Sequence, residues 1–111
     1  MISEQIRERF LQDPLPIRLG GLAADLARIS SFSENPSNRQ AVASLLEEGK
    51  CFAEWAAPSA PLETQAVLAE IQVMLAVWQR RWANGLPIPD LHAEADRRAE
   101  QLLAIAGLVE R

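Results

Sequence analysis

Apolar residues recur every three or four positions along most of the chain, a spacing that places their side chains on one face of an α-helix. Proline and glycine clusters interrupt this pattern near residues 13–16, 35–36, 58–61 and 84–89. Prolines and glycines are typical of helix boundaries. The sequence therefore predicts five helices, at residues 2–12, 14–33, 36–57, 62–84 and 87–107.

Each of the last four predicted helices has one continuous apolar stripe. In the second helix the stripe has a 4-3-4-3 spacing, which keeps its members within one narrow arc and is typical of a helix-bundle seam. Gly49 lies within the stripe of the third helix, where it favours close approach of a neighbouring helix. The stripes are Leu15, Leu19, Leu22, Leu26 and Ile29; Val42, Leu45, Leu46, Gly49, Phe52, Ala53 and Ala56; Leu68, Ile71, Leu75, Trp78 and Trp82; and Leu91, Ala95, Ala99, Leu102, Ile105 and Ala106.

The connections between these four helices are short, and short connections force neighbouring helices to reverse direction. The predicted fold class is therefore all-α, an antiparallel up-down four-helix bundle with a short extra N-terminal helix. We expect one domain over residues 1–111, with an N-terminal arm at 1–12, capped by Ser3, and a four-helix core at 14–111.

Composition narrows the class of protein further. The 111 residues are 49% apolar and carry a net charge of −4, which excludes intrinsic disorder and makes broad attraction to nucleic acid unexpected. The longest apolar run, Val73 to Trp78, is too short to span a membrane. Because Cys51 is the single cysteine and no signal peptide is recognisable, we expect a cytoplasmic protein.

The fourth predicted helix has a second apolar arc that one bundle core does not require. This arc contains Ala66, Ala69, Val73, Ala76, Val77 and Ala83. Two interpretations remain open. In the first, the N-terminal arm covers one such back face and alanine is present simply because it is a good helix former. In the second, the arc binds a second copy or another protein, since small residues permit close helix packing. We predict partner contacts, with a homodimer favoured, at Trp55, Ala69, Val73, Ala76 and Val77.

Arginines supply the candidate polar contacts. Arg98 interrupts the apolar stripe of the fifth helix, where Glu94 one turn earlier is its expected ion-pair partner. Three others, Arg80, Arg81 and Arg97, are predicted to form a rim that attracts an acidic partner. The alternative function is a bundle that binds a small anionic or aromatic ligand in its core, at Trp78, Trp82 and Arg98.

Motifs for catalysis, cofactors or metal are not recognisable in the sequence. His92 and Asp96 lie one turn apart, but a metal site usually needs three or four ligands. The chain has no nucleophile-elbow, phosphate-binding-loop or dinucleotide-binding motif. We therefore predict no enzyme activity, no cofactor and no bound metal, and a function through protein contact.

Three segments carry a resemblance to known proteins: residues 19–29, 47–55 and 79–82. With these segments, roughly residues 17–86 resemble short uncharacterised helical proteins of cyanobacteria. The resemblance implies a source organism and transfers no activity, ligand or site residue.

Overall fold

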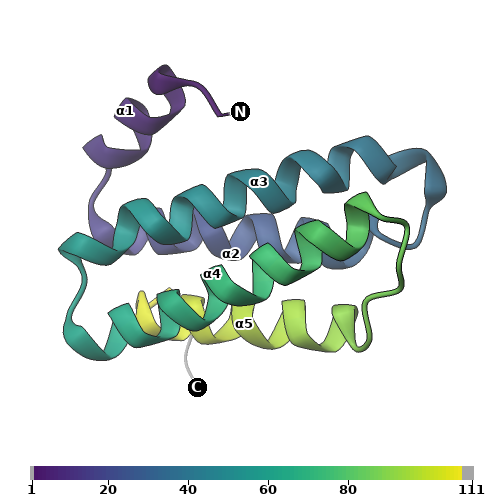
Figure 1. Ribbon diagram of the computed structural model, residues 1–111. Coiled ribbons are helices and arrows are strands. Elements are labelled where there is room, and N and C mark those ends of the chain that lie inside the picture. The colour runs from purple at the N-terminus through teal and green to yellow at the C-terminus, as the bar shows by residue number, and fades with distance from the viewer. Residues whose placement is uncertain (1, 109–111) are drawn as a thin grey trace.

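The computed structural model describes residues 2–108, and within them all regular structure is helical (Figure 1). The α-helices are α1 (Glu4–Gln12), α2 (Leu15–Phe32), α3 (Arg39–Ala56), α4 (Leu62–Ala83) and α5 (Leu91–Ile105). Two 3₁₀ turns, η1 (Pro36–Asn38) and η2 (Ala57–Ser59), flank α3. The predicted all-α class is confirmed.

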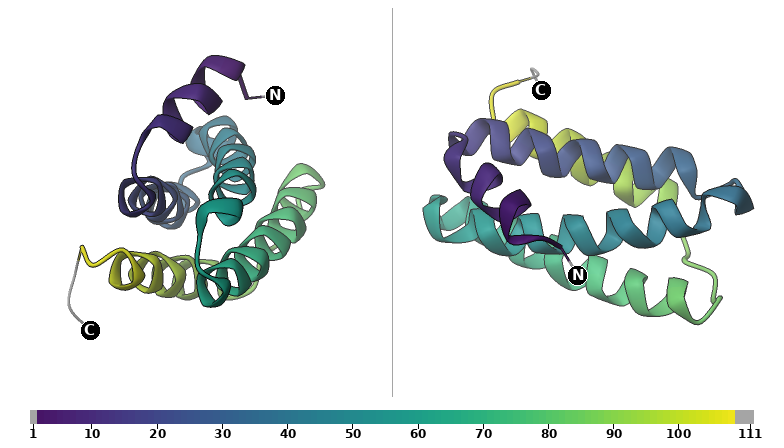
Figure 2. Two further views of the ribbon diagram at one scale, coloured as in Figure 1. Left: turned by 90° about the vertical axis from the view of Figure 1, so that its left-hand side faces the viewer. Right: turned by 90° about the horizontal axis from the view of Figure 1, so that it is seen from above.

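Successive long helices reverse direction from α2 to α5 (Figure 1). α2 packs along both α3 and α5, and α4 packs along α3. The backbones of α4 and α5 are not in comparably close contact, although these helices are consecutive. The left view of Figure 2 looks along these helices and shows how they are arranged around the core. Among neighbouring helices of the core, α4 and α5 therefore have the most widely separated backbones.

The core consists mainly of the predicted stripes. Leu26, Ile29, Leu46 and Ile71 are fully buried. Other stripe residues, among them Leu45 and Phe52, are partly buried and pack against this core. Gly49 is buried, and a Cβ atom there would lie 3.2 Å from Cδ1 of Leu75, so the expected close helix approach is present. One expected inward residue, Ile105, is 39% exposed because it lies in the last turn of α5.

The helix ends follow local capping chemistry. Ser3 accepts a hydrogen bond from the Ile6 amide at 3.2 Å, as predicted for an N-cap. α4 ends in a Schellman motif at Gly85 (φ +68°), whose neighbour Leu86 donates its amide to the Arg81 carbonyl. α5 begins at Leu91 rather than at residue 87, because residues that precede prolines disfavour helical geometry and Asp90 has a left-handed backbone (φ +57°).

α1 lies against α3 and away from α5 (Figures 1 and 2). Its buried Phe10 stacks on Phe52 with ring centroids 4.3 Å apart, and Trp55 completes the cluster at 5.9 Å from Phe10. The arm therefore covers an aromatic patch of α3. It does not cover the outer face of α4, so the expectation that the arm covers that face is wrong.

Candidate functional site

The outer face of α4 is an exposed apolar strip. Leu62, Val73 and Val77 are 80%, 65% and 51% exposed. Small residues fill the strip between them, and all of these are exposed. The positions follow heptad spacing along the whole helix, and we call them the outer seam: Leu62, Ala66, Ala69, Val73, Ala76, Arg80 and Ala83, with Val77 beside them.

On the α3 side, a polar network borders the outer seam. The Gln79 amide donates a hydrogen bond to the Glu47 carboxylate, and the Lys50 ammonium donates to the Gln79 side-chain oxygen at 2.7 Å. Lys50 also pairs with Glu47 at 3.5 Å. The hydrogen bond from Gln79 and the nearby Lys50 charge lower the pKa of Glu47, which keeps this edge ionised.

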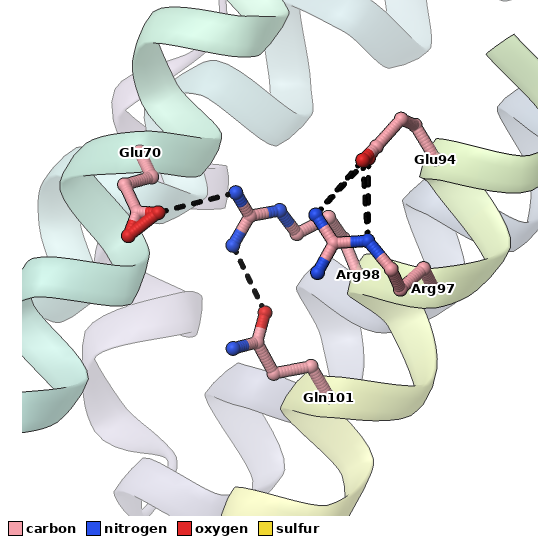
Figure 3. Close-up of polar contacts among 5 residues, drawn as sticks. All are labelled: Glu70, Glu94, Arg97, Arg98 and Gln101. Carbon is pink, nitrogen blue, oxygen red and sulfur yellow. Dashed lines mark hydrogen bonds and ion pairs between the residues drawn. The ribbon is translucent and has the colours of Figure 1, made fainter. Parts of the chain in front are cut away.

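On the α5 side, the border is a set of charged residues between α4 and α5 (Figure 3). The guanidinium of Arg98, a side chain only 12% exposed, donates to Glu70 on α4 at 3.3 Å and to Gln101 at 3.0 Å. Arg97 pairs with Glu94 instead. Its guanidinium donates to both carboxylate oxygens, and the shortest contact, from Nη2 to Oε1, is 2.8 Å. The expected Arg98–Glu94 pair is therefore wrong: Glu94 pairs with the more exposed Arg97, and Arg98 crosses to Glu70.

The structure brings together most, but not all, of the predicted contact residues. Ala69, Val73, Ala76, Val77 and Arg80 share the outer seam. Arg97 lies at its α5 border, near enough for the Glu70 charge to act on it.

The other two predicted contact residues lie elsewhere. Arg81 donates from Nε to the Pro87 carbonyl at 2.7 Å, which ties down the α4–α5 loop. Trp55 is half-buried beneath α1 and below the Arg7 guanidinium, so it is not part of the α4 surface.

The predicted ligand residues do not line one shared hollow. Trp78 is 6% exposed within the core. The indole N–H of Trp82 donates to the Arg39 carbonyl at 3.0 Å, and the Arg39 guanidinium lies 5.2 Å from the centre of that ring. Trp82 borders an open surface hollow of about 470 Å³ beside the α4–α5 loop, but neither Trp78 nor Arg98 lines it.

A serine, histidine and glutamate meet beside this hollow, an arrangement that sequence reasoning missed. His92 Nδ1 lies 3.4 Å from the Ser30 hydroxyl, and His92 Nε2 lies 3.4 Å from the Glu34 carboxylate. The distances are long for catalytic hydrogen bonds, and Ser30 is buried. These contacts instead attach the start of α5 to the end of α2, and the sequence separation of 62 residues gave no local signal for them.

Sequence reasoning also missed a buried acid. Asp25 is 1% exposed, and its Oδ1 lies 3.5 Å from Arg28 while its Oδ2 has no hydrogen-bond partner. Burial, together with the neighbouring Glu48 carboxyl, raises the pKa of Asp25 to about 8. The signal was present in the sequence, because Asp25 lies between Leu22 and Leu26 at the edge of the inward stripe.

Comparisons with known proteins add no assignment. The chain matches no protein-family model, no curated protein and no solved structure. Within residues 2–108, no three or more His, Cys, Asp or Glu side chains are grouped so as to hold a metal ion. None of the helices described is long and apolar enough to cross a membrane.

Proposed function

We propose that this protein acts by protein–protein interaction or assembly, with no catalysis of its own, and that the outer seam of α4 is its binding surface. α2 to α5 form an up-down four-helix bundle that holds the seam rigid, and α1 is an additional helix on α3. The single cysteine, Cys51, suits a reducing compartment such as the cytoplasm.

One observation carries this proposal: a long exposed apolar strip bordered on both sides by ordered polar contacts. Exposed apolar residues scattered singly are normal, whereas a contiguous apolar patch with a polar rim is typical of protein-binding surfaces. Here Val73 and Val77 are more than half exposed, with Gln79 bonded on one side and Glu70 on the other. Because these rim residues are already held by neighbours, the surface loses little side-chain freedom on binding.

Site-specific photo-crosslinking in the native cells tests the proposal. A photoreactive residue replaces Val73 in one variant and Ala27, an exposed alanine on α2, in a matched control. We expect a discrete crosslinked protein, either a second copy or another chain, from position 73 only. Equal crosslinking from both positions, or none from position 73, contradicts the proposal.

The added substitution Ala76→Glu distinguishes specific binding at the outer seam from nonspecific crosslinking. Ala76 is exposed, so a glutamate there is compatible with folding, but it places a charge in the middle of the apolar strip. We expect the position-73 crosslink to disappear in this variant and to persist with Ala27→Glu.

A further inference from the structure

The geometry points to a second copy of this chain as the occupant of the outer seam, its α4 antiparallel to the first about a two-fold axis at Val73. This inference rests on the proposed function, because it names the partner of the same surface. α4 extends from Leu62 to Ala83, so Val73 lies at the middle of the helix. A two-fold axis there pairs the first half of α4 in one copy with the second half of α4 in the other.

The sizes of the seam residues fit this arrangement. When a two-fold axis at Val73 relates the two copies, Val77 of one copy is level with Ala69 of the other, and Arg80 is level with Ala66. At these two levels a larger side chain lies beside an alanine, and at the axis Val73 meets Val73 of the other copy. Heptad spacing keeps such a seam continuous, and alanines let the two backbones approach closely.

The charges along α4 favour the antiparallel direction. Its first half carries Glu63 and Glu70, and its second half carries Arg80 and Arg81. Neither Glu63 nor Arg80 forms an ion pair with any residue that the structure describes. An antiparallel pairing brings Glu63 of one copy within reach of Arg80 of the other, whereas a parallel pairing places like charges side by side.

The size of the surface sets the expected strength. A helix of 22 residues is about 33 Å long, so α4 with its polar borders offers roughly 500 Å² per copy. Standard stable interfaces bury about 800 Å² per partner. We therefore expect a reversible dimer with a dissociation constant on the order of micromolar.

Charge reversal tests both the partner and its direction. Glu63→Arg and Arg80→Glu each place like charges together in an antiparallel homodimer, so each variant alone should dimerise about tenfold more weakly in analytical ultracentrifugation. An equimolar mixture of the two variants should recover the wild-type dissociation constant, because opposite charges then meet at both ends. A parallel dimer already places like charges together, so neither variant alone should weaken it and the mixture should bind more tightly than wild type. That result, or no recovery on mixing, overturns the antiparallel pairing.

Disulfide trapping tests the register in a Cys51→Ser background. Val73→Cys should oxidise to a covalent dimer, since the two cysteines lie together at the axis. Ala69→Cys and Val77→Cys should crosslink to each other when mixed and much less when alone. Ala27→Cys on the exposed side of α2 is the matched control and should stay monomeric.

The two proposals fail in different ways. A wild-type protein that is monomeric at about 200 µM, two orders of magnitude above the expected constant, and forms no disulfide through Val73→Cys overturns the second-copy inference. If position 73 still crosslinks to a different protein in cells, the proposed function stands without that inference. If the wild type is monomeric under these conditions and position 73 crosslinks to no protein in cells, both proposals fail.

Discussion

At the scale of single residues, Asp25 is the most unusual side chain. It is an acid with 1% exposure, faced by Glu48 from α3 and by Arg28 from its own helix. Its unpartnered oxygen, Oδ2, is satisfied when the carboxyl carries a proton that it can donate to Glu48. This explains why burial and the neighbouring carboxyl together raise the pKa of Asp25 to about 8.

The raised pKa of Asp25 predicts a pH-dependent stability. Between the ordinary aspartate pKa of 3.8 and the raised pKa of about 8, the folded chain binds a proton that the unfolded chain releases. The free energy of unfolding should therefore fall as pH rises through this range. Asp25→Asn removes the ionisation and should raise stability at pH about 9 by about 1–3 kcal/mol, with a smaller change at pH about 4. Urea unfolding at both pH values measures the difference.

Asp96→Asn on the exposed side of α5 is the control for Asp25→Asn. It should leave the pH profile of stability unchanged. Parallel profiles for wild type and Asp25→Asn would show that Asp25 is ionised in the folded chain throughout, contrary to this account.

At the scale of helices, the attachment of α1 depends on one side chain. A nine-residue helix is marginal in isolation, and Phe10 is its one buried residue. The ring stacks on Phe52, lies near Trp55 and is covered by the Arg18 guanidinium 6.0 Å from its centre. α1 therefore stays folded only while Phe10 is held by α3.

Phe10→Ala should release α1 without unfolding the other helices. We expect the α1 amides to exchange rapidly with solvent and the 12–14 connection to become sensitive to protease, with a loss of about 3 kcal/mol in stability. Leu11→Ala, at a neighbouring position that is 42% exposed, should have little effect. Equal protection of α1 in wild type and Phe10→Ala would show that other contacts hold it.

Local patterns predicted the helices well and their contacts less well. The 4-3 spacing identified Leu22, Leu26 and Ile29 as core residues because one helix face always turns inward. The ion pair of Arg98 was predicted less well. Spacing of one helical turn predicts Glu94 as its partner, but the packing of α4 beside α5 places Glu70 close to Arg98, and Glu94 pairs with Arg97. Pairings between distant segments depend on how helices stack, which spacing along one helix does not contain.

The candidate site was predictable to a similar degree. The second apolar arc of α4 was visible from its alanines and valines, and its residues lie together on one surface. Whether α1 covers that arc depends on tertiary packing. The prediction that Trp55 contacts a partner fails because α1 places Phe10 beside it, a contact between distant segments that local spacing does not contain. The structure thus separates one predicted contact set into an α4 seam and an α1–α3 cluster.

At the scale of the whole molecule, self-association through α4 should couple folding to protein concentration. A dimer that binds only the folded state stabilises it by an amount that grows with the logarithm of concentration above the dissociation constant. From about 2 µM to about 200 µM, a micromolar dimer should gain roughly 2 kcal/mol, which for a chain of 111 residues raises the thermal midpoint by several degrees. Differential scanning calorimetry across this range measures the shift.

Ala76→Glu should abolish the concentration dependence, whereas Ala27→Glu on α2 should retain it. A midpoint independent of concentration in the wild type would mean that the outer seam does not bind a second copy in this range.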